Sequence, residues 1–353
     1  CFWFDQKVCG AFRFKMNFEK RNPPFPLGKP SEEDGLVDFN LLKEKSFKDL
    51  FIRKEWKSRS LIDESYCFDY VISKSNVGSK SSNCFHWQAR MACDSLNSPS
   101  PIRAWHDRKL KKNIENSIYY KDSYKSALSM RGYISSQFRP SAAKCIYELF
   151  DARTIYDPCG GWGDRLSAAL ATENCDLYYC RDVNPMVFSS YSLQQRAYES
   201  NTETFFEYKG SEVCCPQDNF FDLVFTSPPY FKIEKYQGDL QSHKKFKKFE
   251  DWLNGFLFPM LEHSWLSLKQ GGFMAINISD CYANHTYNRI CMPMIEYCLK
   301  ELPECNLVGV IGYEMTSRKK EGANAEPIAI FRKSKSLNFK DISLEDKQMD
   351  LFT

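Results

Sequence analysis

Hydrophobic and polar positions follow a regular pattern from about residue 141 onward. Apolar runs of four to six residues alternate with longer stretches that carry helical spacing. This alternation is typical of an α/β fold in which a parallel sheet is covered by helices on both faces. The pattern predicts helices over residues 164–171, 185–198 and 252–268, the last ending at a glycine pair, since glycine favours a helix C-terminus. It predicts seven strands, over residues 154–157, 177–181, 205–208, 223–225, 272–278, 307–313 and 327–331.

The ends of the chain do not share this pattern. Residues 1–130 contain a proline-rich stretch near residue 23, a serine-rich loop and no internal repeat. Residues after 333 are polar and charged, which predicts a short helix or a disordered tail. We therefore expect three parts: an N-terminal region over residues 1–130, an α/β domain over residues 131–333, and a C-terminal tail over residues 334–353.

The composition indicates a globular protein with a sizeable core. Of the 353 residues, 43% are hydrophobic and 15% aromatic. No apolar run is long enough for a transmembrane helix, so no membrane association is expected. The fifteen cysteines are scattered without a C-x-x-C pair, which favours reduced thiols. Cys84 and His86 resemble half of a metal site, but no second pair follows at a useful spacing, and no metal is expected.

The charge of the chain is unevenly distributed. Residues 1–140 carry 25 Lys and Arg against 16 Asp and Glu, a balance of +9. Residues 141–353 carry 23 against 29, a balance of −6. This asymmetry favours a polyanion-binding N-terminal half beside a neutral or acidic half, although a solvated basic face would also explain it.

Two loops at predicted strand ends carry the candidate chemistry. The first strand runs into Asp157-Pro158-Cys159-Gly160-Gly161-Trp162-Gly163, and ligands bind at this edge of open α/β sheets. Its glycines do not form the G-x-G-x-x-G pattern of dinucleotide sites. The fourth strand runs into Thr226-Ser227-Pro228-Pro229-Tyr230. This loop combines hydrogen-bond acceptors, a proline-stiffened backbone and an aromatic face.

Together these loops resemble the signature motifs of S-adenosylmethionine-dependent methyltransferases that modify exocyclic amino groups of nucleic-acid bases. The resemblance covers about residues 131–333 and implies the seven-stranded, mostly parallel, Rossmann-like sheet of that family. It implies S-adenosylmethionine as the cofactor. Two of the residues that the resemblance implies also have a purely structural explanation. Asp182 could cap the helix that begins at Pro185. Phe138 belongs to a segment whose Pro140 helix geometry alone would explain. The cofactor-binding residues that the resemblance implies are Asp157, Cys159, Gly160, Gly161, Gly163, Asp182, Ser211, Phe138 and Thr226.

The resemblance also assigns the catalytic loop. Ser227 and the carbonyl of Pro228 are expected to hold the amino protons of a flipped base, Pro229 to stiffen the loop, and Tyr230 to stack on the ring. Methyl transfer then needs positioning and no covalent enzyme intermediate. Ser-Pro-Pro-Tyr is more typical of cytosine N4 enzymes, and adenine N6 is the alternative. A cytosine carbon-5 enzyme would need a Pro-Cys nucleophile after the fourth strand, where this chain has none.

These features predict a DNA cytosine-N4 methyltransferase that acts on a specific sequence. An RNA base amino-methyltransferase and a catalytically silent nucleic-acid-binding subunit are the other interpretations. Only about 60 residues separate the two loops, so we expect recognition of DNA in residues 1–130. Its phosphate contacts are predicted at Arg103, Arg108, Lys109, Lys111 and Lys112. A restriction endonuclease or another subunit is the expected protein partner, in the cytoplasm of a bacterial or virus-infected cell.

Overall fold

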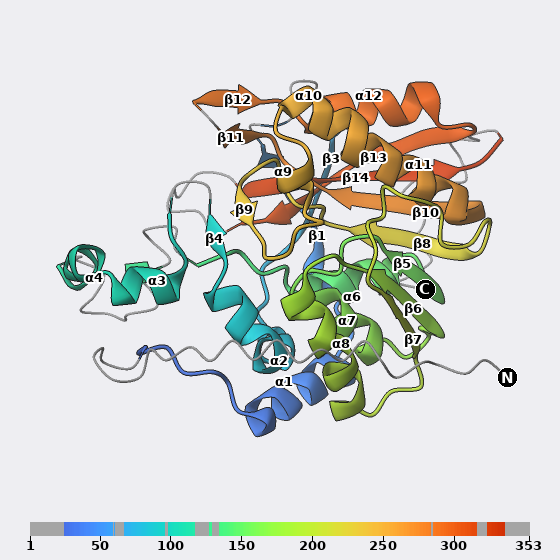
Figure 1. Cartoon of the computed structure of the whole chain (residues 1–353). Helices are drawn as coiled ribbons and strands as arrows, with labels where there is room; N and C mark the ends of the chain where they lie inside the picture. Colours follow the sequence, from blue (N-terminus) through green and yellow to red (C-terminus); the bar gives the residue numbers. More distant parts are fainter. Residues whose placement is uncertain are drawn as a thin grey trace, which may run out of the picture.

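The computed structural model places one large mixed sheet at the centre of the chain, with helices on both faces (Figure 1). It describes residues 25–58, 60, 67–95, 98–116, 127–128, 134–283, 285–315 and 323–335. Among these residues no helix combines the length and the apolar character needed to span a bilayer.

Five parallel strands form the half of the sheet that carries both loops. Their order is β7-β6-β5-β8-β10, and they comprise β5 Thr154–Asp157, β6 Leu177–Arg181, β7 Glu203–Glu207, β8 Phe221–Thr226 and β10 Leu268–Asn277. Then β14, Ala323–Lys333, pairs antiparallel with β10, and β13, Cys305–Glu314, pairs antiparallel with β14. All seven strands predicted from the sequence are therefore confirmed, as is the α/β fold with a mostly parallel sheet.

The alternation of side chains along the strands separates two cores. On β5, Ile155 packs with one cluster and Tyr156 with the other, and on β8 the neighbours Leu223 and Val224 divide in the same way. One cluster lies under α6 Pro140–Leu149, α7 Asp164–Ala171 and α8 Pro185–Ala197. The other lies under α10 Phe249–Trp252, η3 Leu253–Leu257, α11 Phe258–Ser267 and α12 Cys291–Glu301.

The third helix does not end at the glycine pair, as the sequence analysis predicted. The helix ends at Ser267, and its C-cap residue Leu268 is already extended. Gly271 instead lies inside β10 with φ of +83°, where the pairing with β8 shifts register. The glycine favours a left-handed backbone position, and in this chain the strand uses it for an irregularity in the ladder.

The N-terminal region is joined to the central sheet. The strands β1 Phe51–Arg53 and β3 Cys67–Ile72 extend the sheet beyond β13, and the short β2 Trp56–Lys57 pairs with β14. The helices α1 Glu32–Glu44 and α2 Ser79–Met91 pack on α7, and α2 also packs on α8. The strands β1, β2 and β3 thus share one sheet with the predicted α/β domain, and the division at residue 130 stays a functional prediction.

Two short helices stand apart from the sheet, at the left of Figure 1. They are α3 Pro101–His106 and α4 Arg108–Glu115, which follow the strand β4 Asp94–Ser95. β4 pairs antiparallel with β9 Glu234–Lys235, which lies shortly after the Ser-Pro-Pro-Tyr loop. This small ladder ties the basic N-terminal segment to the predicted catalytic loop. The remaining short elements are η1 Lys48–Leu50, α9 Ser242–Lys245, β11 Cys281–Ala283 and β12 Thr286–Asn288.

Candidate active site

The two predicted loops lie side by side because β5 and β8 are neighbouring parallel strands. Ile155 is paired with Leu223 and Tyr156 with Val224, so both strands end at the same edge of the sheet. The Oγ1 of Thr226, the last residue of β8, donates to Oδ1 of Asp157, the last residue of β5, at 2.9 Å. This hydrogen bond joins the ends of the two strands directly.

The three glycines of the first loop have different surroundings. A Cβ on Gly160 would collide with Cys180 and with the hydroxyl of Tyr191, so this residue lies against the protein interior. Gly163 has φ of +70° as the N-cap residue of α7, and a Cβ there would meet His86 on α2. A Cβ on Gly161, which has φ of +60°, would make only ordinary contacts, 3.8 Å from Arg165 and from the carbonyl of Cys159, and Gly161 lines a cavity. Only Gly161 of the three therefore faces a possible ligand.

Asp157 lies beneath this cavity and is fully buried. Its carboxylate accepts hydrogen bonds from Nε of Arg165 at 2.7 Å and from the hydroxyl of Tyr178 at 2.6 Å. The backbone N–H of Cys159 and the hydroxyl of Thr226 complete four donors from the chain itself. Asp157 and Arg165 thus form a buried ion pair that fixes the loop from below.

Asp182, at the end of β6, does line the cavity. Its carboxylate accepts hydrogen bonds from the backbone N–H of Gly161 at 2.8 Å and of Asn184 at 2.7 Å. Burial raises the pKa of Asp182 to about 6, and those two backbone donors oppose the rise. Further donors from a ligand would favour its ionised form.

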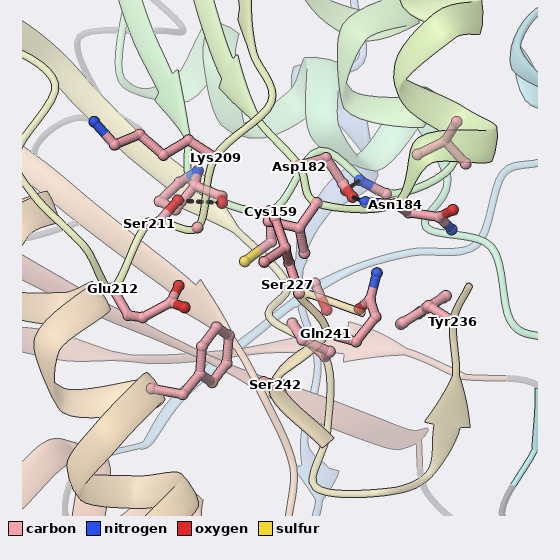
Figure 2. A pocket seen from close by; sticks show the side chains of 18 of the residues that line it. Cys159, Asp182, Asn184, Lys209, Ser211, Glu212, Ser227, Tyr236, Gln241 and Ser242 are labelled. Atoms are coloured by element: carbon pink, nitrogen blue, oxygen red, sulfur yellow. Dashed lines mark hydrogen bonds between the residues drawn. The ribbon is translucent and has the colours of Figure 1, made fainter. Parts of the chain in front are cut away.

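The cavity is partly open to solvent, and its empty space, open solvent included, is about 580 Å³. Figure 2 shows Asp182 and Asn184 at one end, Lys209, Ser211 and Glu212 at the other, and Ser227 between them. An acidic residue beside a glycine loop fits the ribose hydroxyls of a nucleoside cofactor. The segment after β8 supplies one wall of the cavity, through Tyr236, Leu240, Gln241 and Ser242.

Of the other predicted cofactor residues, some line the cavity and others do not. Cys159 and Ser211 line the cavity, and the hydroxyl of Ser211 donates to the carbonyl of Pro158 at 2.5 Å, which ties the loop after β7 to the glycine loop. Thr226 is buried below the cavity. Phe138 lines a neighbouring cavity and stacks on Tyr313, with ring centroids 4.6 Å apart.

A second cavity, partly open to solvent, also borders Ser227, and its empty space, open solvent included, is about 1,210 Å³. Ser227, Pro228 and Tyr230 line it, whereas Pro229 lines the first cavity. The hydroxyl of Tyr230 donates to Oε2 of Glu326 on β14 at 3.2 Å, which fixes the position of the ring. The residues that line both cavities are Gly161, Trp162, Ser227 and Tyr236.

Carboxyl groups gather around the second cavity, and none of them was expected from the sequence. Burial raises the pKa values of Asp164 and Glu234 to about 7, and it also raises the pKa of Glu326. At neutral pH such groups supply both acceptors and protonated donors. Glu326 could have been noticed, because an acidic residue interrupts the apolar run 325–331. Nothing in the sequence distinguishes Glu234 from the other charges near it.

The possible metal half-site has other partners. His86 Nε2 lies 2.8 Å from Oε1 of Gln194, and the Cys84 thiol donates to the carbonyl of Ser81 at 3.3 Å. Burial lowers the pKa of His86 to about 4, so the imidazole is neutral. Within the described part of the chain, no group of three or more His, Cys, Asp or Glu side chains could hold a metal ion.

Residues 221–351 match the model of the family described as DNA methylase. This segment begins with β8 and includes the Ser-Pro-Pro-Tyr loop, which lies between the two cavities. The glycine loop lies outside it. No curated protein matches the chain.

Three solved structures illustrate the partial likeness to known folds. An S-adenosylmethionine-dependent O-methyltransferase from Thermotoga maritima is 11% identical, with a TM-score of 0.36 over 60% of this chain and 72% of that one. The tRNA methyltransferase TrmI from Aquifex aeolicus is 10% identical, with a TM-score of 0.38 over 57% and 72%. An rRNA methylase from Streptococcus thermophilus is 13% identical, with a TM-score of 0.35 over 57% and 100%.

The sequence match therefore falls on the part of the chain that carries the predicted catalytic loop, and it confirms the resemblance there. The expected cofactor has a cavity whose lining fits it. The match of residues 221–351 to the DNA methylase family supports an S-adenosylmethionine-dependent nucleic-acid methyltransferase.

Proposed function

We propose that the chain methylates the exocyclic amino group of a base in DNA, with cytosine N4 as the target. The observation that carries this proposal is the position of Ser227, which lines both cavities. A methyl donor in the first cavity and a flipped base in the second would meet at this residue. The match of residues 221–351 to the DNA methylase family supports DNA as the nucleic acid.

We assign the cofactor contacts to the residues that line the first cavity. Asp182 would accept from the ribose hydroxyls, and Gly161 allows close approach of the backbone. Cys159 and Ser211 would form the wall between the two ends. Asp157, Gly160, Gly163 and Thr226 would act from beneath, by holding the loop in shape. When bound, S-adenosylmethionine supplies an electrophilic methyl group on a sulfonium.

The second cavity would hold the base and direct its amino nitrogen. The amine is a poor nucleophile because its lone pair is delocalised into the ring. Ser227 Oγ and the Pro228 carbonyl would accept its N–H protons, and Tyr230, fixed by Glu326, would stack on the ring. Ser227 and Pro228 would hold the nitrogen so that its lone pair points at the methyl group that S-adenosylmethionine would supply. The nitrogen then loses a proton to water or to a nearby carboxylate, with no covalent enzyme intermediate.

We also propose that residues 1–130 contact the DNA backbone through α3 and α4. Asp94 of β4 pairs with Arg103 and accepts from the backbone N–H of Ser100, which anchors the start of α3. Lys111 lies over the Trp105 ring at 3.9 Å and pairs with Glu115. The side chains of Arg108, Lys109 and Lys112 are exposed on α4 and are the best placed for phosphates.

Mass spectrometry of nucleosides tests the chemistry. DNA and RNA would be incubated with the protein and a cofactor carrying a labelled methyl group, then digested. N4-methylcytosine in DNA is the expected product. N6-methyladenine alone would overturn the cytosine assignment, product only in RNA would overturn DNA as the substrate, and no labelled nucleoside would overturn the proposal as a whole.

A further inference from the structure

The hairpin formed by β11 and β12 displays two exposed tyrosines. Tyr282 is 59% exposed and Tyr287 is 46% exposed. They are directly paired across the two strands, so both rings project from the same face of the ribbon. Neighbouring large rings that remain accessible to solvent often mark a binding surface.

The opposite face of the hairpin is fixed to the body of the protein. Cys281, Ala283 and Asn288 are buried, and the first two join the apolar cluster that contains Phe231. The Cys281 thiol donates to the carbonyl of Phe231, the residue after the Ser-Pro-Pro-Tyr loop, at 3.6 Å. The Asn288 side-chain amide donates to three carbonyl oxygens within the hairpin.

The base of the hairpin is also closed. Oδ1 of Asp280 accepts from the backbone N–H groups of Ile290 at 2.7 Å and Cys291 at 2.9 Å. Together with the buried face, this holds the backbone of the hairpin in place before any partner binds. Less backbone entropy is then lost on binding than for a loop without these contacts.

One of the two rings borders the second cavity. Tyr282 lines that cavity together with Ser227 and Tyr230. In Figure 1 the hairpin protrudes at the upper left, above β9, which belongs to the segment after the catalytic loop. Residues 281–290 contain an arginine and a histidine and no acidic residue, and Asp280 lies at the base of the hairpin.

We propose that the outer face of this hairpin binds the nucleotide next to the target base, by stacking of that base on Tyr282 and Tyr287. The inference rests on the proposed function, because it places the target base in the second cavity. Extrusion of one base leaves its neighbours partly unstacked. Exposed aromatic rings bind unstacked bases of any sequence, because each base has a π-face.

Binding of a fluorescein-labelled single-stranded DNA of random sequence, followed by anisotropy, tests the stacking. The variants are Tyr282→Thr and Tyr287→Thr, since threonine keeps the preference for a strand but removes the ring. Each should weaken binding by about 5- to 150-fold, the range expected for one base–aromatic stack. Tyr282→Phe and Tyr287→Phe should bind like the parent. The control is Phe205→Ala, which removes a 54% exposed ring on β7 at the far edge of the sheet.

A salt titration separates stacking from charge. Loss of a ring should shift the affinity at all salt concentrations without changing the slope of log K against log salt. A flattened slope in the threonine variants would overturn the inference. Cofactor binding by each variant shows whether the fold is retained.

Photo-cross-linking of the parent protein makes the test independent of the variants. Single-stranded DNA that contains 4-thiothymidine should cross-link to a peptide that includes residues 281–288. The hairpin proposal would be overturned by cross-links confined to other peptides, or by threonine variants that both bind DNA like the parent. If the parent still transferred methyl groups, the proposed function would be unaffected by either result. Failure of the parent to methylate any nucleic acid would instead refute the proposed function.

Discussion

The buried pair of Asp157 and Arg165 yields the sharpest prediction of stability. Both side chains are almost fully buried, with 0% and 5% exposed, and Nε lies 2.7 Å from Oδ2. In Asp157→Asn the neutral amide would leave the guanidinium without its counter-charge. The NH₂ of the new asparagine would also face donors. These are Arg165 and Tyr178 in one orientation of the amide, and Thr226 and Cys159 in the other.

Removal of one partner from a buried pair costs about 3–5 kcal/mol. Each unsatisfied donor costs about 1–3 kcal/mol, but these contributions overlap with the loss of the pair and are not added to it. We therefore expect the free energy of unfolding to fall by about 3–5 kcal/mol.

Urea denaturation followed by intrinsic fluorescence measures this change. Asp176→Asn is the matched control, because Asp176 also pairs with an arginine, Arg153, at 2.7 Å. That pair is exposed, at 54% and 65%, so its loss should cost only about 0–1 kcal/mol. If Asp157→Asn unfolded at the same urea concentration as the control and yet lost cofactor binding, Asp157 would be a direct ligand contact and the supporting role would be refuted.

Three further predictions concern binding and catalysis. Calorimetry should show tighter cofactor binding as the pH rises through about 6, because burial raises the pKa of Asp182 to about 6 and the ribose hydroxyls need its ionised form. Asp182→Asn should weaken cofactor binding and remove this pH dependence. A pH profile that is unchanged in Asp182→Asn would refute the assignment. Without cofactor the sign for stability is opposite: since the folded pKa lies above the ordinary value of 3.8, the contribution of Asp182 is full below about pH 4 and is lost as the pH rises through about 6. Ser227→Ala and Tyr230→Ala should lose most methyl transfer but keep cofactor affinity, so an equal loss of both would contradict their placement at the base. Reversal of charge at Arg108, Lys109 and Lys112 should weaken DNA binding and flatten the salt slope by about one unit for each phosphate that is no longer neutralised, whereas Lys300→Glu on α12 should not.

The local pattern of the sequence was enough to predict the strands of the sheet, and the resemblance to a known family pointed to the two loops. Buried strands are visible as short apolar runs and amphipathic helices as a period of 3.6 residues, both without knowledge of the fold. All seven strands lie where the periodicity indicates, with small shifts at their ends. The glycine loop after β5 and the Ser-Pro-Pro-Tyr loop after β8 lie at the carboxyl ends of parallel strands. Ligands bind at this edge of open α/β sheets, which made both loops candidate sites.

The tertiary structure decided which of these residues line a cavity. Asp157 follows its strand as Asp182 does, but Arg165 from α7 and Tyr178 from β6 occupy its carboxylate, whereas Asp182 opens to the cavity. It also placed Glu326 beside Tyr230 and joined β1 and β3 to the sheet. These outcomes depend on pairing between segments far apart in the chain. The orientation of a side chain depends on what lies across from it, and local periodicity does not encode that partner.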